Sequence, residues 1–453
     1  MVRWNTAQRC AAMVCAAGAA LVGAGCSPGG DAASPTSRSE TRTVVTDASK
    51  LGQVTITEWD KNTFAGPNQA MKEINARFEQ KYPNIKVKRL ARAFEDLKTT
   101  LKLALSSGTP PDVVQVNQGY GDLVAFTKAA LVRPLDPWAE AYGWERRYPA
   151  TLLAQNRVGD DGTWGTGKLY GVSSTAELVG VYYNKSVLAK AGLQPPTSYP
   201  ELVEQLAKLK ASGVQPIEFG ASTKSPTIHL FGTILTSLAG PKLVNDLVFG
   251  RDGASWKDPK AVQALTTLGD WAKQGYINKD ANGKTEAQAG ADFQKGKAAF
   301  YVSGSWWGGT FKSSDDVGFV ALAPSSGAAP AALGGLGLLW AVTSKSPHPD
   351  AAAAYIDYLN GPEAADIIAK SGDLPANQGG AFKSPADSLQ GELGSNIAKV
   401  LDAGTMAPYL DYATPDFYDV ITAQLQQVIA GRTSASQAAD ALQKEVDSFK
   451  STK

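Results

Sequence analysis

Hydrophobic and polar positions follow a regular order in the first third of the chain beyond residue 53. Three segments show the alternation or short apolar run of a strand, and two segments between them show helical spacing. In chain order these are 54–59, 69–80, 85–90, 94–106 and 112–116. This βαβαβ order predicts a parallel sheet with helices on its faces. Ligands of such sheets bind beyond the carboxyl ends of the strands.

The remaining patterns continue this mixed character to the end of the chain. Strands are predicted at 169–172, 178–183, 298–302 and 318–322. Helices are predicted at 200–211, 349–359, 362–370, 416–430 and 435–449. About 400 residues are too many for one hydrophobic core, so the sequence predicts an α/β protein with two lobes.

The N-terminal end has the pattern of an export signal. Arg3 and Arg9 precede an apolar run at 10–24, whose length of about 15 residues is below the roughly 20 needed for a membrane-spanning helix. Ala24 and Gly25 are small and precede Cys26. We therefore predict a lipoprotein signal peptide at 1–25.

Cys26 is the expected site of lipid attachment, with palmitate among the acyl groups, and 26–52 is expected to be a flexible tether because it contains few apolar residues. Gly23 stands where Leu is usual in a lipoprotein signal, so an ordinary secretory signal cut nearby is the alternative. Lipidation would place the protein outside the cytoplasm, anchored to the outer face of a bacterial cell membrane.

Composition excludes several classes of function. The cysteines lie at positions 10, 15 and 26, so the folded region has no disulfide, and two histidines are too few for a His-based zinc site or triad. We expect no metal and no cofactor. A formal net charge of +1 indicates no nucleic-acid partner. The 10 Trp and 15 Tyr residues have flat apolar faces with a polar tip, which suits the apolar face of a sugar ring.

Five landmarks resemble one protein family when they are taken in order. They are FEQKYPNIKV at 78–87, SGTPPDVV at 107–114, LVRPLD at 131–136, YGV at 170–172 with VYYNK at 181–185, and GKAAFYVSGSWW at 296–307. Together they resemble the sugar-type extracellular solute-binding proteins of ABC importers, the family that includes maltose-binding protein. The resemblance covers about 54–448, and its first landmark is similar to that family's first helix running into its second strand.

The resemblance implies a periplasmic-binding-protein-like fold of type II, with a mainly parallel sheet flanked by helices in each lobe. The N-terminal lobe would comprise 53–174 and 336–375, and the C-terminal lobe 178–332 and 379–448. Three crossings between the lobes would form a hinge that closes over a ligand. The expected function is capture of a carbohydrate, a di- or oligosaccharide, for delivery to an ABC permease by a monomeric, non-enzymatic lipoprotein.

The resemblance also implies ligand contacts in the C-terminal lobe and at the hinge. Trp306 matches the family's stacking tryptophan, and its neighbour Trp307 is the second candidate, although it would then pack inward. Glu177 matches a carboxylate that bonds sugar hydroxyls. Tyr418 matches an aromatic sugar platform, with Phe417 as the alternative if the helix register slips by one residue.

Strand ends supply the candidates of the other lobe, where the chain departs from the maltose binder. Trp59 and Asp60 end the first strand, and Asn117, Gln118 and Tyr120 follow the third.

His229 stands at the start of a predicted helix, where the family often has an aromatic residue facing the cleft. A hydrogen-bonded core histidine is the alternative at this position.

Two other functions remain open from the sequence. An exported glycosidase would also carry tryptophans and carboxylates in a cleft, and it needs two carboxyl groups at a defined separation. The same fold could bind a non-sugar solute. A polyamine would require several carboxylates in the cleft, whereas a phosphate ester would require arginines or helix N-termini.

Overall fold

The computed structural model describes residues 44–327, 329–377 and 384–452. The predicted signal peptide, Cys26 and the tether up to residue 43 lie outside the described residues. The chain from Val44 onward forms one compact unit. Within the described ranges, we find no helix with the length and apolarity that a membrane crossing requires.

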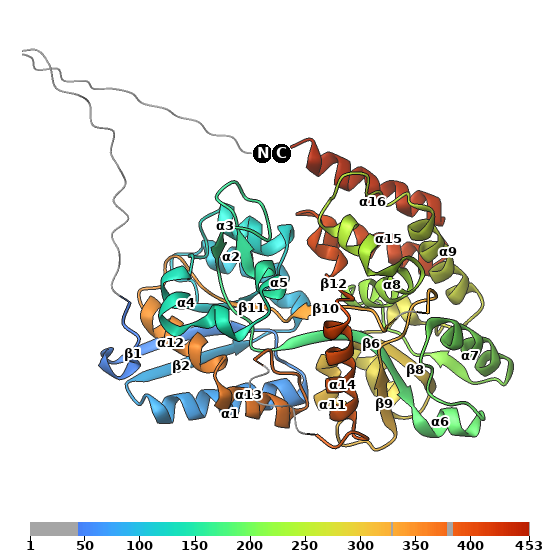
Figure 1. Ribbon diagram of the computed structural model, residues 1–453, viewed down its shortest axis with the longest axis horizontal. Helices are drawn as coiled ribbons and strands as arrows, with labels where there is room; N and C mark the ends of the chain where they lie inside the picture. The colour runs from blue at the N-terminus through green and yellow to red at the C-terminus, as the bar shows by residue number, and fades with distance from the viewer. Residues whose placement is uncertain (1–43, 328, 378–383, 453) are drawn as a thin grey trace, which may run out of the picture. The chain divides into compact units, whose positions relative to one another are not determined.

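The first sheet has four strands in the order β11, β3, β1 and β2 (Figure 1). Their bounds are Val54–Asp60 for β1, Ile85–Ala91 for β2, Val113–Val116 for β3 and Leu339–Val342 for β11. β1 pairs in parallel with β2 and with β3, and β11 is antiparallel to β3. The predicted βαβαβ order is therefore confirmed, and the carboxyl ends of β1 and β3 share one edge.

Helices on this sheet close the first core. They are α1 (Ala65–Lys81), α12 (Pro349–Leu359) and α13 (Pro362–Ser371). The buried leucines of α2 (Phe94–Ser106) belong instead to a larger apolar cluster that extends into the second sheet. The predicted bounds of α2 and α12 are confirmed. Ile74 and Phe78 of α1 are fully buried, and the Phe78 ring meets that of Tyr355 edge-on at 5.1 Å. Burial of such side chains contributes about 1.5–3 kcal/mol each.

The second sheet is built around β6, whose nine residues are all buried. The strand order is β12, β10, β6, β8 and β7, with β9 also paired to β6. Their bounds are Ala176–Asn184 for β6, Gln215–Ile217 for β7, Ala298–Gly304 for β8, Val317–Val320 for β9, Ala332–Leu336 for β10 and Met406–Ala407 for β12.

The expectation of a mainly parallel sheet holds for the first sheet and is wrong for the second. β6 is antiparallel to β8, β9 and β10, and the parallel pairs are β7 with β8 and β10 with β12. Alternation of apolar residues locates a strand but does not encode its direction. The antiparallel pairing places the end of β8 beside the beginning of β6, since Gly304 pairs with Val179.

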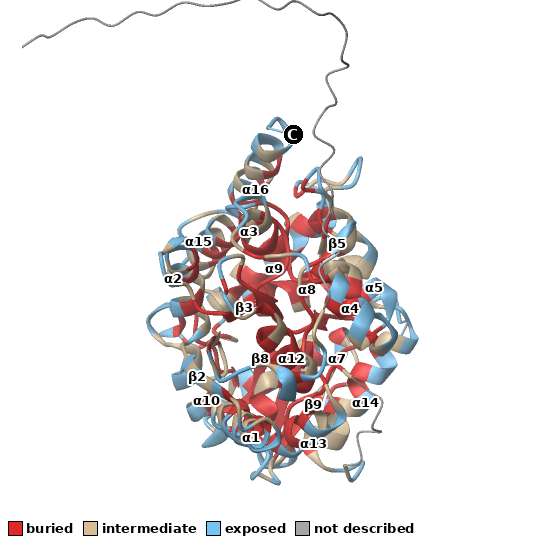
Figure 2. Cartoon of the chain, turned by 90° about the vertical axis from the view of Figure 1, so that its left-hand side faces the viewer, coloured by how far each residue is buried: buried red, intermediate tan, exposed pale blue. Residues whose placement is uncertain are grey.

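The remaining helices surround the second sheet and the cleft side. They are α6 (Lys185–Lys190), α7 (Tyr199–Ala211), α8 (Ser225–Val248), α9 (Pro259–Lys273), α10 (Glu286–Gln294), α11 (Gly308–Phe311), α14 (Leu389–Asp402), α15 (Phe417–Ile429) and α16 (Ala435–Lys450). Short helices α3 (Ala125–Lys128), α4 (Asp136–Tyr142) and α5 (Ala150–Leu153) and the two-stranded sheet of β4 (Arg157–Val158) and β5 (Lys168–Leu169) follow β3. Figure 2 shows the buried residues concentrated on the inner strands and inward helix faces.

The chain passes between the two sheets three times. It leaves the first sheet after β3 and enters the second at β6, and it returns between β10 and β11, which are separated by two residues. The third passage runs from α13, which packs on α1, to α14, which packs on β9. This agrees with a hinge of three crossings, whereas the lobe boundaries given above stay a prediction.

The end of the predicted tether is packed against the first core, which corrects its boundary. Ala48 is buried in a short 3₁₀ helix, and Val44 and Leu51 lie against the apolar cluster of the first sheet. Asn84 Nδ2 donates to the Ala48 carbonyl at 2.9 Å and to the Leu51 carbonyl. Three apolar residues spaced three or four apart are enough to dock a segment whose composition is otherwise polar.

Candidate functional site

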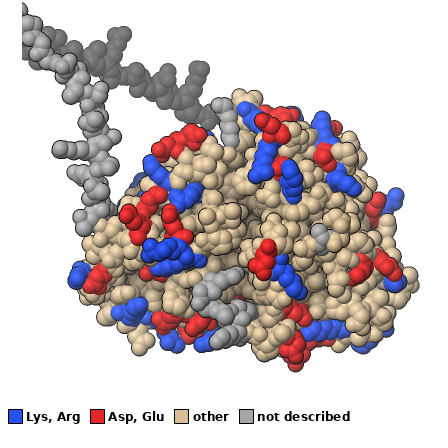
Figure 3. All heavy atoms as spheres, in the orientation of Figure 1, with Lys and Arg blue, Asp and Glu red and all other residues tan. Residues whose placement is uncertain are grey.

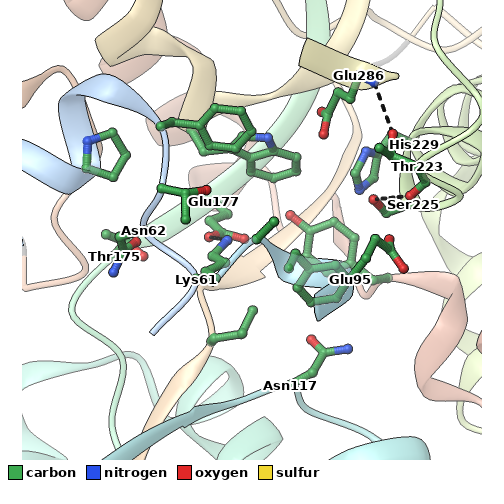
Figure 4. Close-up of a pocket in the computed structure, with 18 of the residues that line it drawn as sticks. Lys61, Asn62, Glu95, Asn117, Thr175, Glu177, Thr223, Ser225, His229 and Glu286 are labelled. Carbon is green, nitrogen blue, oxygen red and sulfur yellow. Dashed lines mark hydrogen bonds and ion pairs between the residues drawn. The ribbon is translucent and has the colours of Figure 1, made fainter. Parts of the chain in front are cut away.

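A cavity of about 250 Å³ lies where strand ends and loops of both sheets meet. Its volume is slightly below the roughly 300–1,000 Å³ of small-molecule sites. Polar and aromatic side chains make up most of its wall: Lys61, Asn62, Thr63, Phe64, Phe94, Glu95, Asn117, Thr175, Glu177, Thr223, Ser225, His229, Glu286, Ser305, Trp306, Asp373, Tyr409, Asp411, Tyr412 and Tyr418. In Figure 4, Glu177 and Lys61 meet near the centre of the view and Asn117 approaches from below.

Trp306 enters the cavity directly after β8. Gly304 is required at this point because a Cβ there would lie 1.9 Å from the Trp306 ring. The indole lies 5.0 Å from the His229 ring, and the Lys61 ammonium lies 5.2 Å from its centroid. An ammonium at this distance interacts favourably with the ring, so Lys61 covers part of the indole in this conformation.

Trp307 turns away from the cavity and belongs to the second core. It is 3% exposed and packs on Phe64 and Phe311 at 4.8 and 5.2 Å. Its Nε1 donates to Glu286 Oε1 at 3.0 Å, and Ser303 Oγ donates to the same oxygen at 2.8 Å. Trp307 therefore orients a carboxylate of the cavity wall without facing the cavity itself.

Glu177 is the hinge carboxylate, near the start of β6. Lys61 Nζ donates to its Oε1 at 2.7 Å, and the two side chains are only 17% and 8% exposed. Lys61 follows β1 of the first sheet, so this ion pair joins the two sheets across the cavity. The short separation of β6 from the end of β8 explains why Glu177 and Trp306 share one site.

The cavity is lined by five carboxylates, namely Glu95, Glu177, Glu286, Asp373 and Asp411. Among the described lining residues, Lys61 is the one lysine, and none is an arginine. Hydroxyl, amide or indole groups of the protein donate hydrogen bonds to three of the four carboxylates other than Glu177. The Tyr418 hydroxyl donates to Glu95, Asn117 Nδ2 donates to Asp411 at 2.9 Å, and Ser303 and Trp307 serve Glu286. Carboxylates accept hydrogen bonds and do not donate them when ionised, so the wall suits a ligand rich in donors.

Burial is the largest influence on the pKa of four of these acids. It raises the pKa of Glu95, Glu286 and Asp411. It raises the pKa of Asp373 to about 7, with the positive charge of Lys61 opposing this shift and the negative charge of Glu177 reinforcing it.

The side chains of His229 and Tyr409 at the aromatic end of the cavity are uncharged near pH 7. Burial, and then the charge of Lys61, lowers the pKa of His229 to about 3, so this imidazole is neutral near pH 7. Burial raises the pKa of Tyr409 well above its usual value, and the ring lies 6.0 Å from that of His229. The Nδ1 atom of His229 and the hydroxyl of Tyr409 are buried and have no hydrogen-bond partner.

Five of the ten residues predicted as ligand contacts line the cavity: Asn117, Glu177, His229, Trp306 and Tyr418. Phe417, the alternative to Tyr418, is fully buried against Trp256. His229 lies near the start of α8, as predicted, but its unpartnered Nδ1 does not match the alternative of a hydrogen-bonded core histidine. Whether these five contact a ligand stays a prediction.

The other five do not line the cavity, because each has a different partner. Besides Trp307, Asp60 is fully buried and accepts from Arg89 Nε at 2.6 Å. Trp59 lies under the Arg92 guanidinium at 4.6 Å. The strand-end argument placed these residues at the correct edge but one position too early, since Lys61 is the residue that reaches the cavity.

Gln118 and Tyr120 hold the rim together instead. Gln118 is 1% exposed, donates to the Gly337 carbonyl at 2.9 Å and accepts from the Tyr412 hydroxyl at 3.1 Å. Tyr120 packs edge-on against Phe449 at 4.9 Å. Both residues therefore connect segments that surround the cavity.

The wall residues that sequence reasoning missed include all the charged ones except Glu177, namely Lys61, Glu95, Glu286, Asp373 and Asp411, and the phenol of Tyr409. Glu286 had a local signal, because Thr285 and Gln288 form a capping box that fixes the start of α10 next to it. Lys61 follows β1 and Glu95 lies in the first turn of α2, so both belong to elements that were predicted. Asp373, Tyr409 and Asp411 lie in segments for which the chain offers no local pattern.

Acidic and basic side chains are intermixed on the face drawn in Figure 3. Among the described residues, no group of three or more His, Cys, Asp and Glu side chains is arranged to hold a metal ion.

Two α/β lobes around an inner cavity with a hinge of three crossings define the class of two-lobed solute receptors. Comparison with known proteins identifies the family. The family model for bacterial extracellular solute-binding proteins matches residues 62–366, and the chain belongs to this family. Its members act outside the cytoplasm and are binding proteins.

Individual relatives are consistent with this assignment. An uncharacterized ABC transporter extracellular-binding protein of Pyrococcus horikoshii is 28% identical over 378 residues, which is 80% of this chain and 81% of that protein. A chitin oligosaccharide binding protein of known structure is similar with a TM-score of 0.76, at 21% identity over 88% of this chain and 99% of that chain. A solute-binding protein in complex with raffinose has a TM-score of 0.70, at 20% identity over 87% and 99% of the two chains.

Proposed function

We propose that this protein is the carbohydrate receptor of an ABC importer and that it captures its ligand in the cavity between the two sheets. The observation that carries the proposal is the indole of Trp306 in a wall that also presents carboxylates, an amide and hydroxyls. An apolar sugar face stacks on such a ring, and its hydroxyls donate to carboxylates. The matches to chitin oligosaccharide and raffinose binders support the same ligand class.

A thermal-shift panel tests this proposal, because a ligand that binds only the folded state raises the melting temperature. The probes follow the named ligands of the structural neighbours: chitin oligosaccharides, galactose, raffinose, stachyose and maltose. A concentration-dependent shift with one sugar series is expected. The proposal would be contradicted if none of the neutral sugars raised the melting temperature.

A polyamine is the second candidate ligand, because five carboxylates line the cavity against one lysine. Spermidine and putrescine therefore belong in the same panel. A shift with these amines alone would keep the fold assignment and replace the carbohydrate by a cationic solute.

We further propose that the protein binds without catalysis. The carboxyl of Asp373, whose pKa burial raises to about 7, is the group that most resembles the general acid of a glycosidase. Chromatography of the sugar after prolonged incubation separates the two functions. Unchanged sugar is expected, and hydrolysis products would make the protein an enzyme.

The anchoring at Cys26 is also proposed, together with the signal peptide at 1–25 and delivery of the ligand to a membrane permease. In the native host, Cys26→Ser should abolish incorporation of labelled palmitate and release the protein from the membrane fraction, because the thiol that carries the lipid is lost. Ser27→Ala serves as the matched control. Equal membrane association of Cys26→Ser and wild type would contradict the lipid anchor.

A further inference from the structure

The aromatic end of the cavity contains two buried polar groups that the fold leaves without partners. They are the Nδ1 atom of His229 and the hydroxyl of Tyr409, and both residues are 7% exposed. Glu177 lies close enough to the Tyr409 hydroxyl to raise its pKa further, but the geometry falls short of a hydrogen bond. Leaving such a group unsatisfied destabilises the folded state, so each group calls for a partner that the chain does not supply in this conformation.

The positions of these groups relative to Trp306 indicate what that partner is. The His229 ring lies 5.0 Å from the Trp306 ring and 6.0 Å from the Tyr409 ring. All three residues line the same cavity but come from different segments, namely α8, the turn after β8 and the loop after β12. A flat ring on the indole would therefore present its edge to both polar groups.

The chemistry of the two groups selects an uncharged ligand. Neutral imidazole has one donor and one acceptor nitrogen, and a phenol hydroxyl both donates and accepts. A sugar hydroxyl also does both, so it satisfies His229 in either tautomer and Tyr409 in either direction. Lys61 and Glu177 are already paired with each other beside this subsite, so a carboxylate or ammonium of the ligand would lose its hydration and would face a like charge as well as an opposite one.

We propose that Trp306, His229 and Tyr409 form a subsite for one uncharged sugar ring, in which His229 Nδ1 and the Tyr409 hydroxyl bond ring hydroxyls. The proposal rests on the carbohydrate function given above and adds the specificity-determining residues His229 and Tyr409. The ion pair of Lys61 and Glu177 borders this subsite on the side of the hinge.

Tyr409→Phe is the critical variant, because it removes one oxygen atom and keeps the ring. The chain offers a matched control in Tyr358 of α12, whose hydroxyl is also buried without a hydrogen bond, lies near a glutamate and is outside the cavity. The chain from Val44 onward serves for these measurements, since it forms a compact unit. Dissociation constants are measured by calorimetry with the neutral sugar that gives the largest thermal shift.

Tyr409→Phe and His229→Phe should each weaken sugar binding roughly 3- to 10-fold, as expected for loss of one neutral hydrogen bond. Tyr358→Phe should leave affinity unchanged. The melting temperature of ligand-free Tyr409→Phe should not fall, because an unsatisfied buried hydroxyl has been removed. Monodeoxy analogues of the sugar should identify the hydroxyl that Tyr409 bonds. For one analogue, the affinity for wild type should be lower than that of the parent sugar, whereas the affinities of the analogue and the parent sugar for Tyr409→Phe should be equal.

Two results would overturn the inference. Equal sugar affinity in wild type and Tyr409→Phe would assign the Tyr409 hydroxyl to packing alone while leaving the carbohydrate function intact. Tighter binding of the uronic acid or amino analogue than of the neutral sugar in wild type, with the preference lost in His229→Phe, would show a charged group in this subsite. Absence of binding by every neutral sugar would instead remove the proposed function, and the inference with it.

Discussion

Replacement of Trp306 by alanine tests the stacking surface on which the carbohydrate proposal depends. A Trp side chain buries 150–250 Å² in full, and a ligand on one face covers about half of that, or roughly 100 Å². At about 25 cal/mol per Å², this contact contributes about 2.5 kcal/mol to binding. Lys61 lies over the ring at 5.2 Å in the present conformation, and displacing it costs about 0.5 kcal/mol.

The expected net loss in Trp306→Ala is therefore about 2 kcal/mol, or roughly a 30-fold weaker dissociation constant. Calorimetric titration with the sugar found by the thermal-shift panel measures it. Urea unfolding of the ligand-free protein must accompany the titration, because Trp306 is also partly packed against two apolar clusters of the core. A modest decrease in the free energy of unfolding is expected.

Trp307 provides the matched control one residue away. It is 3% exposed and packs against Phe64 and Phe311, so Trp307→Ala should reduce the free energy of unfolding by about 3–5 kcal/mol. Under conditions in which this variant remains folded, its dissociation constant should change less than that of Trp306→Ala. Equal affinity of Trp306→Ala and wild type would refute the stacking argument, whatever the stability of the two variants.

Two further predictions follow from the buried acid and from the aromatic contacts at the rim. Burial raises the pKa of Asp373 to about 7, so between about pH 4 and 7 the folded state keeps a proton that the unfolded chain releases. The free energy of unfolding should therefore fall as the pH rises through this window, and Asp373→Asn should flatten this slope when urea unfolding is measured at several pH values. An unchanged slope would assign the pH dependence to other groups. Trp164 stacks on Phe249 at 4.7 Å and meets Tyr412 edge-on at 5.5 Å. Trp164→Ala should therefore weaken closure and raise the radius of gyration of the ligand-free protein, which X-ray scattering measures. An unchanged radius of gyration would contradict a role of these contacts in closure.

Helices with an apolar period or a marked start were predictable from the sequence, and a long helix without that period was not. α2 was located to the residue because its apolar positions recur at helical spacing against a polar face. α12 was also located to the residue although nine of its eleven residues are buried, and Pro349 at its first position is a start signal that needs no polar face. α8 was missed apart from its start. Its residues are buried on nearly every side, and Gly240, with φ +80°, breaks the helix before Pro241. A helix without a polar face has no amphipathic period to detect.

The same distinction applies to the cavity. Residues that follow a strand, such as Trp306 and Asn117, could be located because strand ends are visible in the sequence and share an edge of the sheet. Asp373 and Tyr409 come from a loop and a short segment after a two-residue strand, and only the tertiary fold brings them to the cavity. Local pattern carries no information about such contacts between distant segments.

The antiparallel pairing in the second sheet, which the sequence did not reveal, is what assembles the site. Had β8 run parallel to β6, its carboxyl end would lie beside Asn184 at the far end of β6, away from Glu177. In the observed register Gly304 pairs with Val179, two residues from Glu177, and the chain turns there to present Trp306. The hinge carboxylate and the stacking surface are thus adjacent by strand direction alone. A ligand held between them therefore contacts the strand that connects the two lobes, which is where a binding event can act directly on closure.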